Sequence, residues 1–142
     1  MHDDDVIYLA HFYPFSYTQL RCSLSELEIV SKNMIRQPLT YSLGGNLLEL
    51  LTITDFSAPA EVIRSRPVIV LTNRVHPGEA NSSWVLQGLL KYLLSCETSA
   101  LTLLQRAVFK IAPMLNPDGV IDGNISMRKI PCFSGTINQL FQ

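Results

Sequence analysis

A histidine and a glutamate separated by a Pro-Gly pair have the types and the spacing of two metal ligands. The motif is His76-Pro77-Gly78-Glu79, between the apolar run 67–72 and an amphipathic stretch that begins near Ser82. Because proline fixes φ and glycine permits positive φ, the chain can reverse here and aim both side chains at one point. An imidazole nitrogen and a carboxylate oxygen would supply two of the three protein ligands of a catalytic zinc ion. So short a motif also occurs in ordinary turns whose side chains face solvent, and its surroundings are therefore decisive.

The elements that would position this motif alternate between strand and helix, which indicates an α/β fold. Before the motif we predict a strand over residues 8–12, a helix over 16–34, a strand over 47–54, a linker over 57–66 and a strand over 67–72. After it we predict a helix from residue 81 or 82 to 95, a short helix over 99–106 and a strand over 107–112. The continuous apolar run 67–72 is typical of a strand buried on both faces of its sheet.

A second turn motif, Asn116-Pro117-Asp118-Gly119, follows the last predicted strand. Ligands of open α/β sheets bind in the crevice beyond the carboxyl ends of strands, and both motifs occupy such positions. The sequence therefore predicts that a functional site lies there. Asp118 is a possible carboxylate ligand, although we interpret it first as a turn residue that bonds its own backbone.

Two segments carry a family resemblance that agrees in order and spacing. Residues 73–84 contain the His-Pro-Gly-Glu motif, and residues 109–120 contain the Asn-Pro-Asp-Gly turn and are followed by Gly123-Asn124. Together they resemble the zinc metallocarboxypeptidases and, within these, the cytosolic carboxypeptidases. The similarity extends upstream through residues 8–18, 43–46 and 50–54, and it covers about residues 6–124 in all.

The resemblance implies a fold, an activity and a cofactor. The implied fold is α/β, a carboxypeptidase-like mixed sheet flanked by helices, of which residues 1–124 form an incomplete N-terminal half and residues 125–142 a divergent tail. The implied activity is hydrolysis of C-terminal residues, with glutamates of acidic, tubulin-like polypeptide tails as substrates and partners. In this family zinc polarises the scissile carbonyl and activates water, a glutamate acts as general base, and an arginine binds the terminal carboxylate.

The resemblance makes His76 and Glu79 the first two zinc ligands. The family's third ligand is a histidine well downstream, whereas the other histidines of this sequence, His2 and His11, precede the motif. His11 could approach in space, and Cys132 is a further conceivable ligand, but we interpret Cys132 as a free thiol. We therefore expect an incomplete set of zinc ligands.

The family's other catalytic groups also lack clear counterparts. The position of the carboxylate-binding arginine is occupied by Ser126, with the nearest arginine at Arg128, and the last glutamate is Glu97. We expect the chain to be a shortened form of a longer carboxypeptidase, without turnover by itself. Trp84 is interpreted as a core or helix-start aromatic rather than a substrate contact, and Arg74 as either a carboxylate-binding or a surface residue.

Composition excludes several other classes of protein. The 142 residues are 47% hydrophobic and 16% charged, with a formal net charge of -1 and scattered basic residues, so one domain and no nucleic-acid partner are expected. The start lacks a secretory signal and no apolar run is long enough for a membrane span, which predicts a cytosolic location. Cys22, Cys96 and Cys132 are expected to be free thiols. The alternatives to an enzyme are a weak zinc- or protein-binding module and a product without a stable fold.

Overall fold

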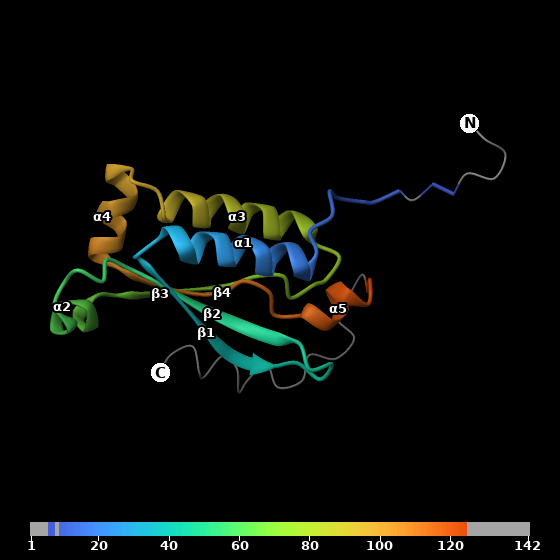
Figure 1. Cartoon of the computed structure of the whole chain (residues 1–142), viewed down its shortest axis with the longest axis horizontal. Helices are drawn as coiled ribbons and strands as arrows, with labels where there is room; N and C mark the ends of the chain where they lie inside the picture. The colour runs from blue at the N-terminus through green and yellow to red at the C-terminus, as the bar shows by residue number, and fades with distance from the viewer. Residues whose placement is uncertain (1–5, 8, 125–142) are drawn as a thin grey trace.

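Residues 6–7 and 9–124, which the computed structural model describes, contain four strands in one mixed sheet and five helices (Figure 1). In chain order the elements are α1 (Tyr17–Val30), β1 (Met34–Tyr41), β2 (Leu47–Ile53), α2 (Ala60–Ser65), β3 (Val68–Thr72), α3 (Ala80–Leu93), α4 (Thr98–Arg106), β4 (Val108–Ala112) and α5 (Pro117–Ile121). The strand order is β1-β2-β4-β3, in which β3 and β4 run parallel and the other neighbours antiparallel. The predicted α/β fold, a mixed sheet with flanking helices, is confirmed.

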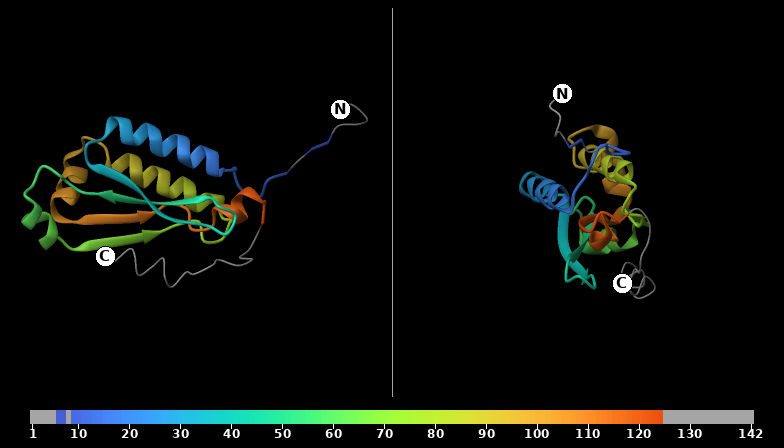
Figure 2. Two further views of the ribbon diagram at one scale, coloured as in Figure 1. Left: turned by 60° about the horizontal axis from the view of Figure 1, so that its bottom comes forward. Right: turned by 90° about the vertical axis from the view of Figure 1, so that its right-hand side faces the viewer.

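Helices α1 and α3 lie side by side along one face of the sheet, as Figures 1 and 2 show. Alternation along β2 divides its apolar side chains between two clusters. Leu51 and Ile53 join the main core, which includes residues of both helices, whereas Leu48 and Leu50 join a smaller cluster on the opposite face. Because full burial of one leucine contributes about 1.5–3 kcal/mol, these clusters hold firmly the strands from which the candidate motifs emerge.

Helix α1 begins at a reciprocal capping arrangement. The Ser16 hydroxyl accepts a hydrogen bond from the Gln19 backbone N–H at 3.1 Å, and the Gln19 side-chain oxygen accepts one from the Ser16 N–H at 2.8 Å. Both bonds satisfy donors that a helix start otherwise leaves free. Ser16 is therefore the N-cap of α1.

Replacement of this cap should weaken the protein measurably. We expect Ser16→Ala to lower the free energy of unfolding by about 1 kcal/mol, because the Gln19 N–H loses its acceptor. Urea unfolding followed by circular dichroism measures the change. The control is Ser99→Ala, an exposed position within α4, which should change stability little. Equal losses in both variants would contradict the capping role.

Two elements were missed by the sequence-based prediction. Helix α1 ends at Val30, and the end of the predicted helix 16–34 is instead the start of β1. Strand β1 contains Pro38 and a shift of register between Pro38 and Thr40, which is tolerated because β1 lies at the edge of the sheet. The predicted linker 57–66 contains the short helix α2.

Two other predictions were wrong. Residues 9–12 of the predicted strand 8–12 are irregular, and residue 8 lies outside the described ranges. Strand β3 is not buried on both faces, since Val68 and Ile69 are 52% and 40% exposed. Among the described residues β3 pairs only with β4 and is an edge strand. An apolar run reveals strand propensity but not the number of neighbours that cover the strand.

Cys22 and Cys96 are exposed free thiols, as predicted, whereas Cys132 lies outside the described residues. No helix in the described part of the chain is both long and apolar enough to cross a membrane.

Candidate functional site

Parallel pairing of β3 and β4 brings the two turn motifs to the same end of the sheet. Beyond the strands, the Asn73 N–H donates to the Ala112 carbonyl at 3.0 Å and the Leu115 N–H donates to the Asn73 carbonyl at 3.0 Å. The Asn116 N–H then donates to the Arg74 carbonyl at 3.2 Å. These bonds continue the β3–β4 pairing past the strand ends, so the two motifs are held together at the carboxyl edge, where the sequence predicts a site.

His76 and Glu79 point at one another across their turn. His76 Nδ1 lies 3.0 Å from Glu79 Oε1, and the two side chains remain 50% and 56% exposed. The Glu79 backbone N–H donates to the His76 carbonyl at 3.2 Å and closes the turn. The imidazole and the carboxylate therefore converge as the Pro-Gly spacing predicts, on a surface that an ion can reach from solvent.

The spacing of this pair fits two ligands of one zinc ion. Two ligand atoms at 2.0–2.2 Å from a tetrahedral zinc stand about 3.4 Å apart, so Nδ1 and Oε1 need to separate by only a few tenths of an ångström. Glu79 is the N-cap residue of α3, where the helix dipole favours a negative charge. Its side chain makes no capping hydrogen bond. The carboxylate is therefore available to bind a metal ion.

Arg74 lies beneath the turn and is buried. Its side chain donates to the carbonyls of Pro77 and Phe15 and to the hydroxyl of Ser83. Burial lowers the pKa of Arg74 below its usual value, and the negative charge of nearby Glu79 partly offsets this effect. Neither of the expected roles, surface residue or carboxylate ligand, fits this position, because the guanidinium is enclosed by backbone and α3.

Helix α5 packs directly against the turn through a glycine. A Cβ atom added to Gly119 would lie 2.6 Å from Cγ of Pro77 and 3.0 Å from the side-chain nitrogen and oxygen of Asn116. Asn116 caps α5 by accepting from the Gly119 N–H at 3.0 Å, and its amide donates to the Val75 carbonyl at 3.3 Å. The second motif therefore braces the first, and the absence of a side chain at Gly119 permits the close approach.

Asp118 does not bond its own turn, contrary to the first interpretation. Its carboxylate accepts from Ser42 Oγ at 2.5 Å, from the Gly44 N–H at 2.9 Å and from Asn46 Nδ2 at 2.8 Å. These donors belong to the loop between β1 and β2. Nothing local in the sequence indicates this pairing, because the segment with Gly44 and Asn46 by itself predicts only a chain reversal. The carboxylate ties this loop to α5.

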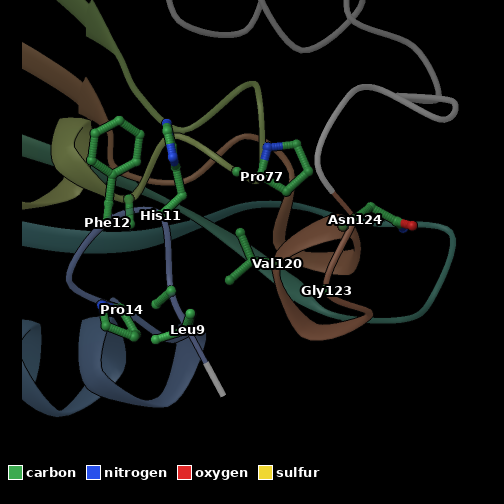
Figure 3. Close-up of a pocket in the computed structure, with 12 residues that line it drawn as sticks. Leu9, His11, Phe12, Pro14, Pro77, Val120, Gly123 and Asn124 are labelled. Carbon is green, nitrogen blue, oxygen red and sulfur yellow. The ribbon is translucent and has the colours of Figure 1, made fainter. Parts of the chain in front are cut away.

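A cavity of about 640 Å³ lies beside the turn. Figure 3 shows its two sides: His11, Phe12 and Pro14 come from the segment before α1, and the opposite side includes Pro77, part of α5 and residues 123–124. Apolar groups dominate this lining, with the imidazole of His11 and the amide of Asn124 as its polar side chains. The cavity is open enough for a peptide side chain to enter next to the candidate ligands.

Trp84 anchors the segment that lines this cavity. Its ring stacks edge to face on Phe15 and Tyr13, with centroids 4.9 and 5.4 Å away, and its Nε1–H donates to the Tyr13 carbonyl at 3.0 Å. The interpretation of Trp84 as a helix-start aromatic fits these contacts. Its position on α3 links the approach to α1 with the helix that begins at Glu79.

Comparison with known families decides the lineage. The family model described as zinc carboxypeptidase matches residues 24–128, which is most of the chain. The chain belongs to the zinc carboxypeptidase family. The match includes β3, β4 and both turn motifs, so the family resemblance inferred from the motifs is confirmed.

Known carboxypeptidases are similar in sequence and in fold. Cytosolic carboxypeptidase 1 of Danio rerio is 50% identical over 131 residues, which cover 87% of this chain and 11% of the relative. Cytosolic carboxypeptidase 2 of Homo sapiens is 46% identical over 126 residues, covering 87% of this chain and 14% of the relative. The metallo-carboxypeptidase from Burkholderia cenocepacia superposes with a TM-score of 0.70 at 26% identity, over 79% of this chain and 30% of that one. This chain therefore spans a small part of each relative's length.

A zinc carboxypeptidase site needs more ligands than this pair. Across residues 6–7 and 9–124, no group of three His, Cys, Asp or Glu side chains is placed to hold one metal ion. His11 lines the cavity without joining such a group, and Asp118 is occupied by three donors. The predicted tail 125–142 lies outside the described residues. It contains three residues that the sequence analysis considered for the site, namely Ser126, Arg128 and Cys132.

Proposed function

We propose that His76 and Glu79 are two zinc ligands of a metallocarboxypeptidase that removes C-terminal residues from polypeptides, with glutamates of acidic tails such as those of tubulin as substrates. The single observation that carries this proposal is the 3.0 Å approach of Nδ1 and Oε1 at the carboxyl end of β3. The family membership and the printed names of the cytosolic relatives support it. The same names support a cytosolic location.

Each part of the site has a distinct task in this proposal. A bound zinc ion supplies Lewis-acid polarisation of a carbonyl and activation of water. His76 and Glu79 hold the ion, and the dipole of α3 supports the negative charge at Glu79. The cavity beside Pro77 and Gly78 receives the end of the polypeptide and keeps its side chain next to the ligands.

Zinc titration of the chain and of three variants tests this assignment. We expect His76→Ala and Glu79→Ala each to weaken zinc binding at least about tenfold, since even loss of a residue that merely supports a ligand costs that much. The matched control is His11→Ala, which removes a histidine of the same cavity and should leave the affinity unchanged. Equal affinities in all four proteins would reject His76 and Glu79 as ligands.

Peptide hydrolysis distinguishes the enzyme from the second candidate, a weak zinc- or protein-binding module. The lack of a three-ligand group among the described residues favours the module for these 142 residues by themselves. His76 and Glu79 are only two of the ligands that the proposed enzyme needs, so we expect the zinc-loaded chain by itself to release no glutamate from a peptide that ends in glutamates. Release that His76→Ala abolishes would show that the chain alone is a complete enzyme.

A further inference from the structure

Arg74 combines two unfavourable features next to the candidate zinc ligands. Its backbone has φ of 52°, in the left-handed region that residues other than glycine seldom adopt. Its side chain is 6% exposed although it carries a charge. Within the described residues, no carboxylate lies close enough to form an ion pair with it. Strain of this kind gathers where a fixed geometry serves a function.

The contacts of Arg74 show which geometry is fixed. Nε donates to the Pro77 carbonyl at 3.0 Å, so the guanidinium holds the peptide group in the middle of the His76–Glu79 turn. Nη1 donates to Ser83 Oγ at 2.8 Å and to the Phe15 carbonyl at 3.3 Å. One planar group therefore connects the turn, the first turns of α3 and the segment before α1.

Resting on the proposed zinc function, we propose that Arg74 is a positioning residue for the metal site. By holding the Pro77 carbonyl it fixes the turn in which His76 Nδ1 and Glu79 Oε1 converge. The charge strengthens the bond to the carbonyl, and the backbone of Arg74 keeps its left-handed conformation while the side chain makes this bond. Arg74 itself touches neither ligand atom, so it acts on the metal only through the turn.

The shape of the guanidinium is essential to this role. Its donors are held in a rigid fork, so Nε reaches the Pro77 carbonyl while Nη1 stays bonded to the Phe15 carbonyl and to Ser83. A lysine keeps the charge but carries all its donors on one atom. Arg74→Lys therefore separates charge from geometry, and Arg74→Met, of similar length, removes both. Ser83→Ala is the matched control, because it removes one of the two partners of Nη1 and leaves the bonds to the Phe15 and Pro77 carbonyls in place.

Amide hydrogen exchange of the zinc-free proteins tests the positioning directly. We expect Arg74→Lys and Arg74→Met to speed exchange of the Glu79 and Ala80 amides at least about tenfold, as loss of a charge-assisted hydrogen bond implies. The Leu90 amide, in the middle of α3, should exchange at an unchanged rate. Ser83→Ala should leave the amides of Glu79 and Ala80 as they are in the original chain.

Zinc affinity of the same proteins provides the second measurement. We expect both Arg74 variants to bind zinc about 10- to 100-fold more weakly, the usual effect of losing a group that orients metal ligands. Ser83→Ala should retain the original affinity.

Other outcomes distinguish a failure of the positioning role of Arg74 from a failure of the proposed zinc function. Wild-type affinity or unchanged turn exchange in Arg74→Lys would overturn the positioning role and leave the zinc ligands intact. Equally fast exchange throughout α3, or failure of Arg74→Lys to fold, would make Arg74 a general stabilising residue and also overturn it. No zinc uptake by the original chain would overturn the proposed function, and the metal-directed role of Arg74 with it.

Discussion

Gly119→Ala is expected to destabilise the protein by about 2 kcal/mol, although alanine is the better residue for a helix. Helix propensity alone favours alanine by about 1 kcal/mol. The new methyl group, however, would lie 2.6 Å from Cγ of Pro77, and a proline ring cannot move aside without its backbone. Overpacking of this kind costs up to about 3 kcal/mol, so the clash outweighs the gain. Denaturant unfolding measures the difference.

Gly88 offers a matched control for this prediction. It also lies in a helix, α3, but a Cβ atom added there would meet nothing within 4 Å. Gly88→Ala should therefore stabilise the protein by about 1 kcal/mol. Opposite signs at the two glycines are the expected result. If Gly119→Ala is stabilised as well, α5 does not press against the turn, and the bracing of His76 and Glu79 by the second motif is wrong.

Local patterns were sufficient to predict much of the fold. Helix α1 has its cap at Ser16, and α3 has an apolar stripe that buries Leu86, Leu90 and Leu93, so both helices are encoded by neighbouring residues. The edge strands were harder, because their status depends on partners elsewhere in the chain. The run that forms β3 has the composition of a buried strand, yet β3 has a single neighbour among the described residues.

The candidate site divides in the same way between local and distant interactions. The convergence of His76 and Glu79 follows from a turn of four residues and could be predicted from its Pro-Gly pair. The contacts that stabilise this turn from elsewhere in the chain could not be predicted in this way. Asp118 bonds residues 72 to 76 positions away in the sequence, and Arg74 contacts the Phe15 carbonyl 59 positions away. A single sequence shows no periodic pattern from which partners so far apart in the chain could be identified.

Asp118→Ala is expected to lower the free energy of unfolding at neutral pH by about 3 kcal/mol. Three donors, from Ser42, Gly44 and Asn46, lose their charged acceptor, and each such bond contributes about 1 kcal/mol or more after exchange with water. The loop between β1 and β2 then separates from α5. The control is Asp122→Ala, at the exposed end of the same helix, which should stay within about 0.5 kcal/mol of the original chain.

The pH dependence of this loss tests whether the ionised carboxylate is the stabilising form. Burial raises the pKa of Asp118, but the hydrogen bonds from Asn46, Ser42 and Gly44 outweigh it and hold the pKa below its usual value. A depressed pKa in the folded protein means that the stabilisation is complete above the pKa of an unfolded aspartate, about 3.9, and is lost as pH falls through the folded value. Unfolding measured from neutral to acidic pH should therefore show the original chain converging on Asp118→Ala at low pH. A stability difference that stays constant across that range would mean that Asp118 acts through its shape and not through its charge, and the hydrogen-bonded link between the loop and α5 would have to be abandoned.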